Sequence, residues 1–207
     1  YRDTGTQGVD VIEAVGPGDV DIDVTTFGPT SGIEKIDASG AGGAVRILGD
    51  WNNNLLDFRG VTFVGNITIA AGYGNDTVYG TAGNDSIEAG GGDDKVYGGA
   101  GSDTYIVTGN EAGGWDSFSG YDTYSDTGPA GDVDRIVASG DEQVDVGLTK
   151  FNALSGIEVV DGTGAWGGVR LLGDWNDNVL DFRTTTFLGG NVSIDGGYGN
   201  DSITGSV

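Results

Sequence analysis

Apolar residues in this chain recur in short alternating runs, separated by turns rich in glycine and aspartate. Val20, Ile22 and Val24 form one such run, and Ile67 and Ile69 form another. Alternation with period two predicts short strands with one buried face, and the residues between the runs predict tight turns. No interval free of glycine is long or periodic enough to predict an amphipathic helix. The pattern therefore predicts an all-β protein.

The pattern is most regular from Ala71 to Ile106, where four blocks of nine residues follow one another. Each block has glycine at its fourth place, aspartate at its sixth and an apolar residue at its eighth. Glycine suits a tight turn, and the last three residues suit a short strand with one inward side chain. The aspartates at the sixth place are Asp76, Asp85, Asp94 and Asp103.

Two consecutive blocks make one flattened coil, so stacked coils bring alternate aspartates together. Asp76 is then expected above Asp94, and Asp85 above Asp103. Carboxylate and peptide carbonyl oxygens suit a hard cation that takes many ligands in a loose geometry. The spacing therefore predicts two columns of Ca2+ sites that hold several ions. A flexible glycine-rich linker is the alternative, and four consecutive blocks in one register argue against it.

The blocks follow the pattern GGxGxDxUx, in which U is apolar, and in this the chain resembles the RTX (repeat-in-toxin) family. The resemblance implies a parallel β-roll with calcium between successive turns. Because parallel strand connections are almost always right-handed, we expect a right-handed parallel β-solenoid. It also implies that the ligands are the sixth-place carboxylates and carbonyls from the first four places of each block. The glycines concerned are Gly72, Gly74, Gly83, Gly90, Gly92, Gly99 and Gly101. Departures from the pattern are few: Ala71 and Ala89 stand at the first place and Thr81 at the second.

Composition narrows the classes of function. The 207 residues include 42 glycines, no histidine and no cysteine, and 9 basic against 32 acidic residues leave a net charge of −23. Nucleic acid and anionic lipid are excluded as partners because both require clustered basic residues. Ordinary zinc sites and Ser-His-Asp catalysis are excluded as well, so we expect no enzyme activity, with carboxylate-only catalysis as the alternative. The charge predicts a chain that repels itself until calcium binds.

The chain contains no methionine, even at its first position, and no apolar run long enough to cross a bilayer. We therefore expect a piece of a longer protein, with no membrane span. The RTX resemblance implies a bacterial protein that leaves the cell by type I secretion, through a C-terminal signal that would lie outside this piece. The expected location is thus secreted or on the cell surface.

A long internal repeat divides the chain. Residues 173–187 restate residues 49–63 with eleven of fifteen positions identical, at an offset of 124. We predict a first unit over residues 1–123 and a second unit over residues 124–207. The first unit would contain wide coils at 1–70, calcium coils at 71–106 and an aromatic junction at 107–123. The second unit would end in one nonapeptide, whose predicted metal ligand is Asp201.

The spacing of apolar residues predicts that the wide coils continue the same solenoid. In this interpretation Gly49–Asp57 is a degenerate nonapeptide, with Asn54 in place of the aspartate and Leu56 at the apolar place. The expected inward pairs are Ile36 with Leu56, Ile47 with Ile69, Leu56 with Val78 and Ile69 with Ile87. Only the tight coils, each made of two nonapeptides, are expected to hold ions.

Other residue patterns leave alternatives open. Trp115, Phe118, Tyr121 and Tyr124 place an aromatic residue at every third position of the junction, which indicates either a plug over the last tight coil or a sugar-binding surface. The same choice applies to Trp51 and Trp175, and the structural role is favoured. Arginine and aspartate residues that recur in the wide coils predict ion pairs or hydrogen bonds to turn carbonyls: Arg46, Asp50, Asp57, Arg59, Arg170, Asp174, Asp181 and Arg183.

The sequence therefore predicts a calcium-binding structural module of a secreted or cell-surface RTX protein, which folds when it meets calcium outside the cell. Partners other than calcium would be a cell-surface glycan or neighbouring repeats of the same protein. The alternatives are a carbohydrate-binding or adhesive module that uses exposed aromatic residues, and the non-catalytic tail of a secreted enzyme.

Overall fold

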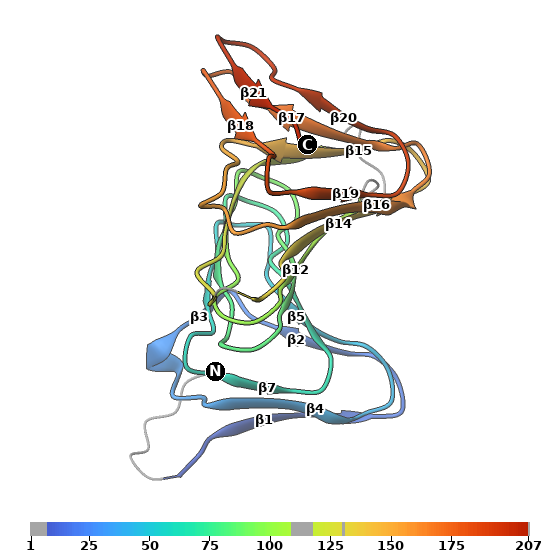
Figure 1. Cartoon of the computed structure of the whole chain (residues 1–207). Coiled ribbons are helices and arrows are strands. Elements are labelled where there is room, and N and C mark those ends of the chain that lie inside the picture. Colours follow the sequence, from blue (N-terminus) through green and yellow to red (C-terminus); the bar gives the residue numbers. More distant parts are fainter. Residues whose placement is uncertain (1–7, 109–117, 130, 207) are drawn as a thin grey trace.

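The chain winds into one stack of parallel β-strands, a β-solenoid (Figure 1). The computed structural model describes residues 8–108, 118–129 and 131–206, and for residues 118 and 119 the backbone alone. Among these residues the only helix is the short 3-10 turn η1 (Pro29–Ser31). The all-β solenoid predicted from the sequence is therefore confirmed.

The N-terminal coils are wide and have three faces. The first face contains β1 (Val11–Gly16), β4 (Lys35–Ala41) and β7 (Thr62–Val64). The second face contains β2 (Val20–Asp23), β5 (Val45–Leu48) and β8 (Ile67–Ala70). The third face contains β3 (Thr26–Phe27), β6 (Leu55–Asp57) and β9 (Thr77–Tyr79).

One of the four expected inward pairs is wrong, because the wide coils have a third face. Ile36 lies beside Phe63 and not Leu56, because it belongs to the first face and Leu56 to the third. The other pairs are confirmed, since the register aligns Ile47 with Ile69, Leu56 with Val78 and Ile69 with Ile87. Leu56 is fully buried at its place in the degenerate nonapeptide.

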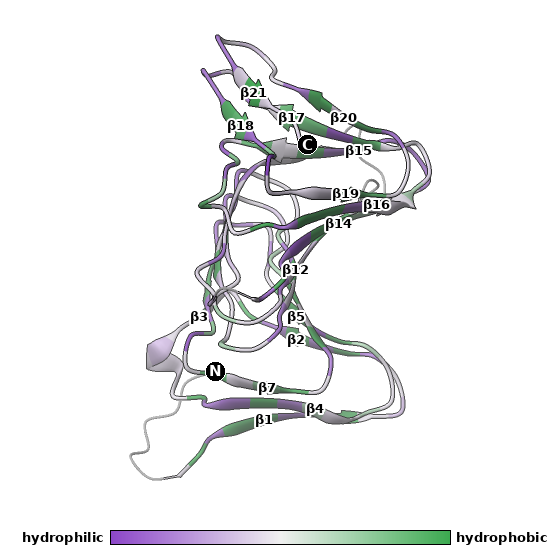
Figure 2. Ribbon diagram, in the orientation of Figure 1, coloured by the Kyte–Doolittle hydropathy of each residue, from purple (hydrophilic) through white to green (hydrophobic). Residues whose placement is uncertain are grey.

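The coils in the middle of the stack are tight and have two faces. Their strands are β10 (Ser86–Glu88), β11 (Lys95–Tyr97), β12 (Thr104–Thr108) and β13 (Phe118–Ser125). In each nonapeptide strand the central apolar side chain is buried while its two neighbours are not, as Val78, Ile87 and Val96 show. One inward side chain per strand is what the repeat predicts, and apolar residues concentrate in the strands of the whole molecule (Figure 2).

The C-terminal coils are wide again and extend to the same side as the N-terminal ones, so the tight coils form a narrower middle (Figure 1). Their strands are β14 (Arg135–Gly140), β15 (Val144–Leu148), β16 (Val159–Ala165), β17 (Val169–Gly173), β18 (Val179–Asp181), β19 (Thr186–Leu188), β20 (Val192–Asp195) and β21 (Ser202–Thr204).

Corresponding strands of the two sequence repeats do not stand above one another. By the offset of 124 positions, β14 and β16 correspond to β1 and β4 of the first face. They nevertheless extend the sheet of β2, β5 and β8, because β10 and β12 connect the two sets. The first face ends at β7, since the tight coils have no third face to continue it. The wide coils at the two ends are therefore displaced by one face.

Candidate calcium sites

The aspartates of one side of the tight coils form a ladder of hydrogen bonds. The main-chain N–H of Asn54 donates to Asp76 Oδ1 over 2.7 Å, and that of Asp76 donates to Asp94 Oδ1 over 2.7 Å. The N–H of Asp94 donates in turn to Asp122 Oδ1 over 3.0 Å. The predicted stacking of Asp76 on Asp94 is therefore confirmed, and the ladder continues into residues outside the nonapeptides.

The other side of the tight coils carries a second ladder of the same kind. The N–H of Asp85 donates to Asp103 Oδ1 over 2.8 Å, as the predicted stacking requires. The N–H of Asp103 donates to Asp134 Oδ1 over 2.7 Å, and that of Asp134 donates to Glu158 Oε2 over 2.9 Å. Asp122, Asp134 and Glu158 extend the two columns. Sequence reasoning missed all three, because Asp122 lies within β13 and the other two lie just before β14 and β16, where no nonapeptide pattern marks them.

The ladders leave carboxylate oxygens without partners. Asp76, Asp94 and Asp103 are each at most 1% exposed, and the Oδ2 atom of each is buried with no hydrogen-bond donor. None of the ion pairs in the described part of the chain involves an aspartate of either ladder. A buried, unpaired carboxylate oxygen is costly unless a cation or a donor satisfies it. The residues therefore fit a hard cation held by oxygen ligands.

The raised pKa values of the ladder carboxyls also show that burying their charge is unfavourable. Burial raises the pKa of Asp76 and of Asp85 to about 6, and that of Asp94 and of Asp103 to about 7. Neighbouring carboxylates add to the effect of burial, because the charge of Asp76 raises the pKa of Asp94 further. Without a cation, the stacked carboxylates therefore hold their protons far above the usual range of aspartate.

A family model for the RTX calcium-binding nonapeptide repeat matches residues 71–105 and 188–207, with four copies. The chain carries RTX repeats. It is therefore a calcium-binding structural module whose tight coils are an RTX β-roll. The search of curated proteins and the search of solved structures gave no match. Among the described residues, no helix has the length and hydropathy that a membrane span requires.

The glycines of the RTX turns allow the turns to approach closely. Six of the seven predicted glycine ligands adopt positive φ angles: Gly72, Gly74, Gly90, Gly92, Gly99 and Gly101. At Gly90 a Cβ atom would lie 1.9 Å from the carbonyl oxygen of Gly72, so only glycine fits. The Gly72 carbonyl accepts the Gly91 N–H over 2.9 Å and retains a second lone pair. The glycine carbonyls remain predicted ligands.

Asp85 differs from the other three repeat aspartates. The Thr81 N–H donates to Asp85 Oδ2 over 2.6 Å, and the Thr81 hydroxyl donates to Asp85 Oδ1 over 3.0 Å. Both oxygens of Asp85 thus have partners within the chain. The hydroxyl bond depends on threonine at the second place, where the RTX pattern has glycine, whereas the N–H bond comes from the main chain.

Asp201 occupies the same position in the second unit as Asp76 in the first. Its Oδ1 atom accepts the N–H of Asn178 over 2.9 Å, as Asp76 accepts that of Asn54. Asp201 is half-buried. The geometry of the ladder is therefore repeated at Asp201, and its role as a metal ligand remains a prediction.

Asparagine replaces aspartate in the wide-coil turn next to Asp76 and in the corresponding turn next to Asp201. Asn54 Nδ2 donates to the Thr25 carbonyl over 3.1 Å and to Asp50 Oδ1 over 2.9 Å. Asn178 Nδ2 makes the corresponding bonds to the Thr149 carbonyl and to Asp174 Oδ1. The two amide nitrogens thus satisfy a carbonyl and a carboxylate oxygen in each turn, although Asn178 Oδ1 is itself buried without a hydrogen-bond partner. This favours the expectation that the wide coils hold no ions.

The recurring arginines form the ion pairs predicted for them. Arg59 pairs with Asp57 and Arg183 with Asp181, both at 2.6 Å. Arg46 pairs with Asp21 at 3.0 Å, and Arg170 pairs with Asp145. Asp50 and Asp174 accept hydrogen bonds from asparagines of their own turns. These pairs lie in the wide coils, where the ladders end.

The aromatic residues divide into buried and exposed ones. Tyr124 is buried, and its hydroxyl donates to Asp122 Oδ2 over 2.9 Å. Trp115 and the Phe118 side chain lie outside the described residues, so the structure does not test the rest of the predicted plug. Trp51 and Trp175 are 77% and 68% exposed, so neither side chain is a buried plug, and the structural role favoured for them stays a prediction.

Trp51 and Trp175 each stack on a tyrosine of the next coil. The Trp51 ring stacks on Tyr73 with centroids 4.5 Å apart, and the Trp175 ring stacks on Tyr198 with centroids 4.6 Å apart. A solvent-facing aromatic pair therefore recurs in both units beside the start of the RTX turns.

Proposed function

We propose that this module works outside the cell, in a secreted or cell-surface protein, and that its tight coils become ordered when calcium binds. The observation that carries the proposal is the burial of unpaired carboxylate oxygens at Asp76, Asp94 and Asp103. Three such oxygens within four consecutive repeats make the folded coils unfavourable at neutral pH without a cation.

Groups of the chain itself favour ordering of the tight coils by calcium. Main-chain N–H groups orient each ladder carboxylate, and calcium supplies the positive charge that the ladders lack. The net charge of −23 favours an expanded chain where calcium is scarce. Calcium modules of extracellular proteins bind at about 10⁻⁴–10⁻³ M, which suits ordering after export and not before.

A calcium titration of the metal-free chain, followed by far-UV circular dichroism, tests this proposal. We expect β content to rise with free calcium, with a midpoint near extracellular concentrations, because binding to the folded state alone stabilises it by mass action. Magnesium is the control cation, since its smaller size and strict octahedral geometry suit these turns poorly. Full β content in excess chelator at neutral pH would contradict the proposal.

In this proposal the module has no catalytic role of its own. Its carboxylates are engaged in the ladders and in arginine pairs, as expected for residues that stabilise the fold. A catalytic domain elsewhere in the parent protein would make the module the tail of a secreted enzyme.

A second candidate function is adhesion through exposed aromatic rings. It is favoured by the stacked pairs of Trp51 with Tyr73 and of Trp175 with Tyr198, which present flat apolar faces to solvent in both units. Aromatic faces with a polar edge suit the stacking of sugar rings.

A glycan array with the calcium-loaded chain tests this second candidate. We expect binding that is lost when Trp51 and Trp175 are both replaced by alanine, while Trp166→Ala, at another exposed tryptophan, leaves it unchanged. No binding to any glycan would leave the module with its structural role alone.

A further inference from the structure

The turn after β13 takes the place of a fifth nonapeptide in the second ladder. It spans residues 126–134 and joins β13 to β14. The Val133 N–H donates to Ser102 Oγ over 2.9 Å, and the Gly101 N–H donates to Asp132 Oδ2 over 3.1 Å. These bonds stack the turn on the fourth RTX repeat, although it has no repeat pattern of its own.

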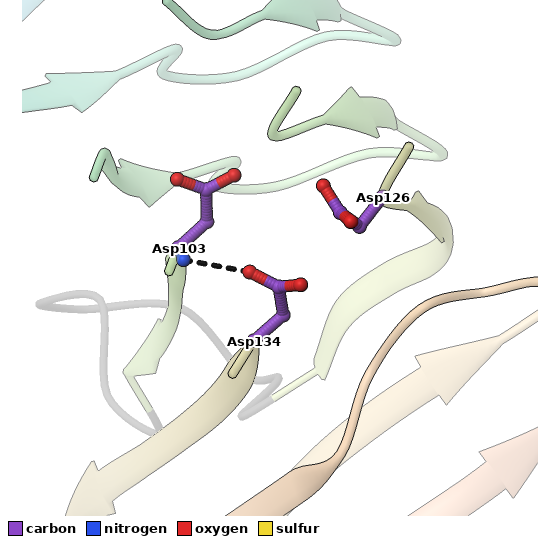
Figure 3. A group of neighbouring side chains, drawn as sticks. All are labelled: Asp103, Asp126 and Asp134. Atoms are coloured by element: carbon purple, nitrogen blue, oxygen red, sulfur yellow. Dashed lines mark hydrogen bonds between the residues drawn. The ribbon is translucent and has the colours of Figure 1, made fainter. Parts of the chain in front are cut away.

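This stacking gathers three carboxylates from two turns. Oxygen atoms of Asp103, Asp126 and Asp134 all lie within 4.8 Å of one another, and Figure 3 shows the three side chains grouped together. Calcium binds oxygen ligands at about 2.3–2.6 Å, so two ligands on opposite sides of one ion lie about 5 Å apart. One calcium ion can therefore contact all three carboxylates.

Two of these carboxylates also have oxygens without partners. Asp103 is fully buried, and its Oδ2 atom has no hydrogen-bond donor. The Oδ1 atom of Asp126 is likewise buried and unpaired, while its Oδ2 atom accepts the Gly128 N–H over 2.6 Å. No ion pair among the described residues neutralises this group. Buried acidic oxygens without donors or cations indicate a missing positive charge.

We propose that Asp103, Asp126 and Asp134 together bind one calcium ion at the junction of the two units. This site lies beyond the nonapeptide pattern, because two of its three carboxylates belong to a turn that no RTX repeat covers. Glu158 positions it from the next coil, since Glu158 Oε2 accepts the Asp134 N–H. The inference rests on the calcium binding of the module and adds a site to it.

The site would join each unit to the one before it. Asp103 belongs to the last repeat of the first unit, whereas Asp126 and Asp134 begin the second. The sequence repeat places Asp3 and Asp10 at the corresponding positions of the first unit. The same pair of acidic residues therefore recurs in the sequence at the start of both units. Calcium would then stabilise the stack across the junction.

Counting bound calcium by native mass spectrometry, with affinities from isothermal titration, tests the site on the whole chain. The test variant is Asp126→Asn, which keeps an oxygen for the Gly128 N–H and removes the charge. The control for charge is Asp141→Asn, at an exposed turn. The control for the repeat sites is Asp94→Asn.

We expect Asp126→Asn to bind one ion fewer than the wild type, or to lose at least tenfold in affinity for one ion. Asp141→Asn should match the wild type, and Asp94→Asn should lose a repeat site. An unchanged count and unchanged affinities in Asp126→Asn overturn the inference, while the loss in Asp94→Asn would still support the proposed function. A wild-type chain that binds no calcium would overturn both.

A second measurement does not depend on how the variant folds. Crystals of the wild-type chain grown in excess calcium should show anomalous density between the carboxylates of Asp103, Asp126 and Asp134. Density in the repeat turns but none at this position would overturn the junction site alone.

Discussion

At the scale of the residue, the ladders make identical side chains differ in chemistry. Asp94 is buried with an unpaired oxygen, whereas the adjacent Asp93 is exposed and accepts the Tyr121 N–H through Oδ1. Asn54 holds the ladder position of an aspartate and uses its amide nitrogen where an unpaired oxygen would otherwise be buried. Asn54 thus finds partners for its amide within the chain, whereas Asp94 retains one oxygen that no group of the chain satisfies.

The substitution Asp94→Asn should therefore have effects of opposite sign with and without calcium. We expect the calcium concentration for half-maximal folding to rise at least tenfold, about 1.4 kcal/mol, because a ligand is lost. The metal-free coils should gain about 1–3 kcal/mol, since a buried unpaired charge is removed. Urea unfolding at several calcium concentrations measures both effects. Asp93→Asn is the matched control, and equal behaviour of the two variants would contradict this account.

The raised pKa values predict that acid stabilises the metal-free fold. The carboxyl of Asp94 has a pKa of about 7 in the folded chain against an ordinary value of 3.8, so the folded state binds more protons between these values. Its contribution to stability is present below the ordinary value and is lost as the pH rises through about 7.

Circular dichroism of the metal-stripped chain should therefore show β content falling between about pH 5 and pH 8. With calcium present, β content should instead rise with pH over this range, because protons compete with the metal for the same oxygens. A metal-free chain whose β content is unaffected by pH in this range would show that the ladder carboxyls are not buried as described.

At the scale of the element, the close approach of successive turns decides which glycines are required. Gly90 has φ +96° and lies directly against the Gly72 carbonyl, whereas Gly83 has no positive φ and its nearest neighbour to a Cβ would be Thr81 Oγ1 at 3.6 Å. Both occupy RTX turns, yet only Gly90 leaves no room for a side chain.

We expect Gly90→Ala to cost about 2–4 kcal/mol of stability in calcium, through backbone strain and displacement of the adjoining turn. Gly83→Ala, its matched control, should change stability by about 0.5 kcal/mol or less. Thermal unfolding in saturating calcium measures the difference. A similar loss of stability in both variants would indicate that the close spacing of the turns does not decide which glycines can be replaced.

At the scale of the whole molecule, two kinds of coil share continuous sheets but differ in what stabilises them. The wide coils have three faces, aromatic stacks such as Phe27 on Phe58, and arginine pairs. The tight coils contribute one inward residue in each of the short strands β9, β10 and β11, and two ladders of acids. Calcium removal should therefore act mainly on the middle of the stack.

Hydrogen exchange measured by mass spectrometry should locate this effect. On addition of a chelator we expect residues 77–97 to lose most of their protection, while β17 and β20 retain a larger share because the pairing between them involves no ladder residue. Loss of protection to the same extent along the chain would show instead that the solenoid unfolds as one cooperative unit.

The nonapeptide period alone determined the tight coils, their parallel stacking and the pairing of Asp76 with Asp94 and of Asp85 with Asp103. A strict repeat makes the register certain, because the same short turn returns the chain to the same place after every second block. The wide coils were predicted less well: their turns differ in length, so spacing did not reveal the third face that separates Ile36 from Leu56.

Only the tertiary structure decided how the ladders end and how the two units are stacked. Asp122 and Asp134 lie 28 and 31 residues from Asp94 and Asp103, whose N–H groups they accept. Asp122 belongs to β13 and Asp134 to the segment before β14, and neither segment has the nonapeptide period, so no local pattern marks them. The displacement of the units by one face follows from two-faced coils between three-faced ones. Local spacing specifies a repeated turn, whereas contacts between unlike turns depend on where the whole chain places them.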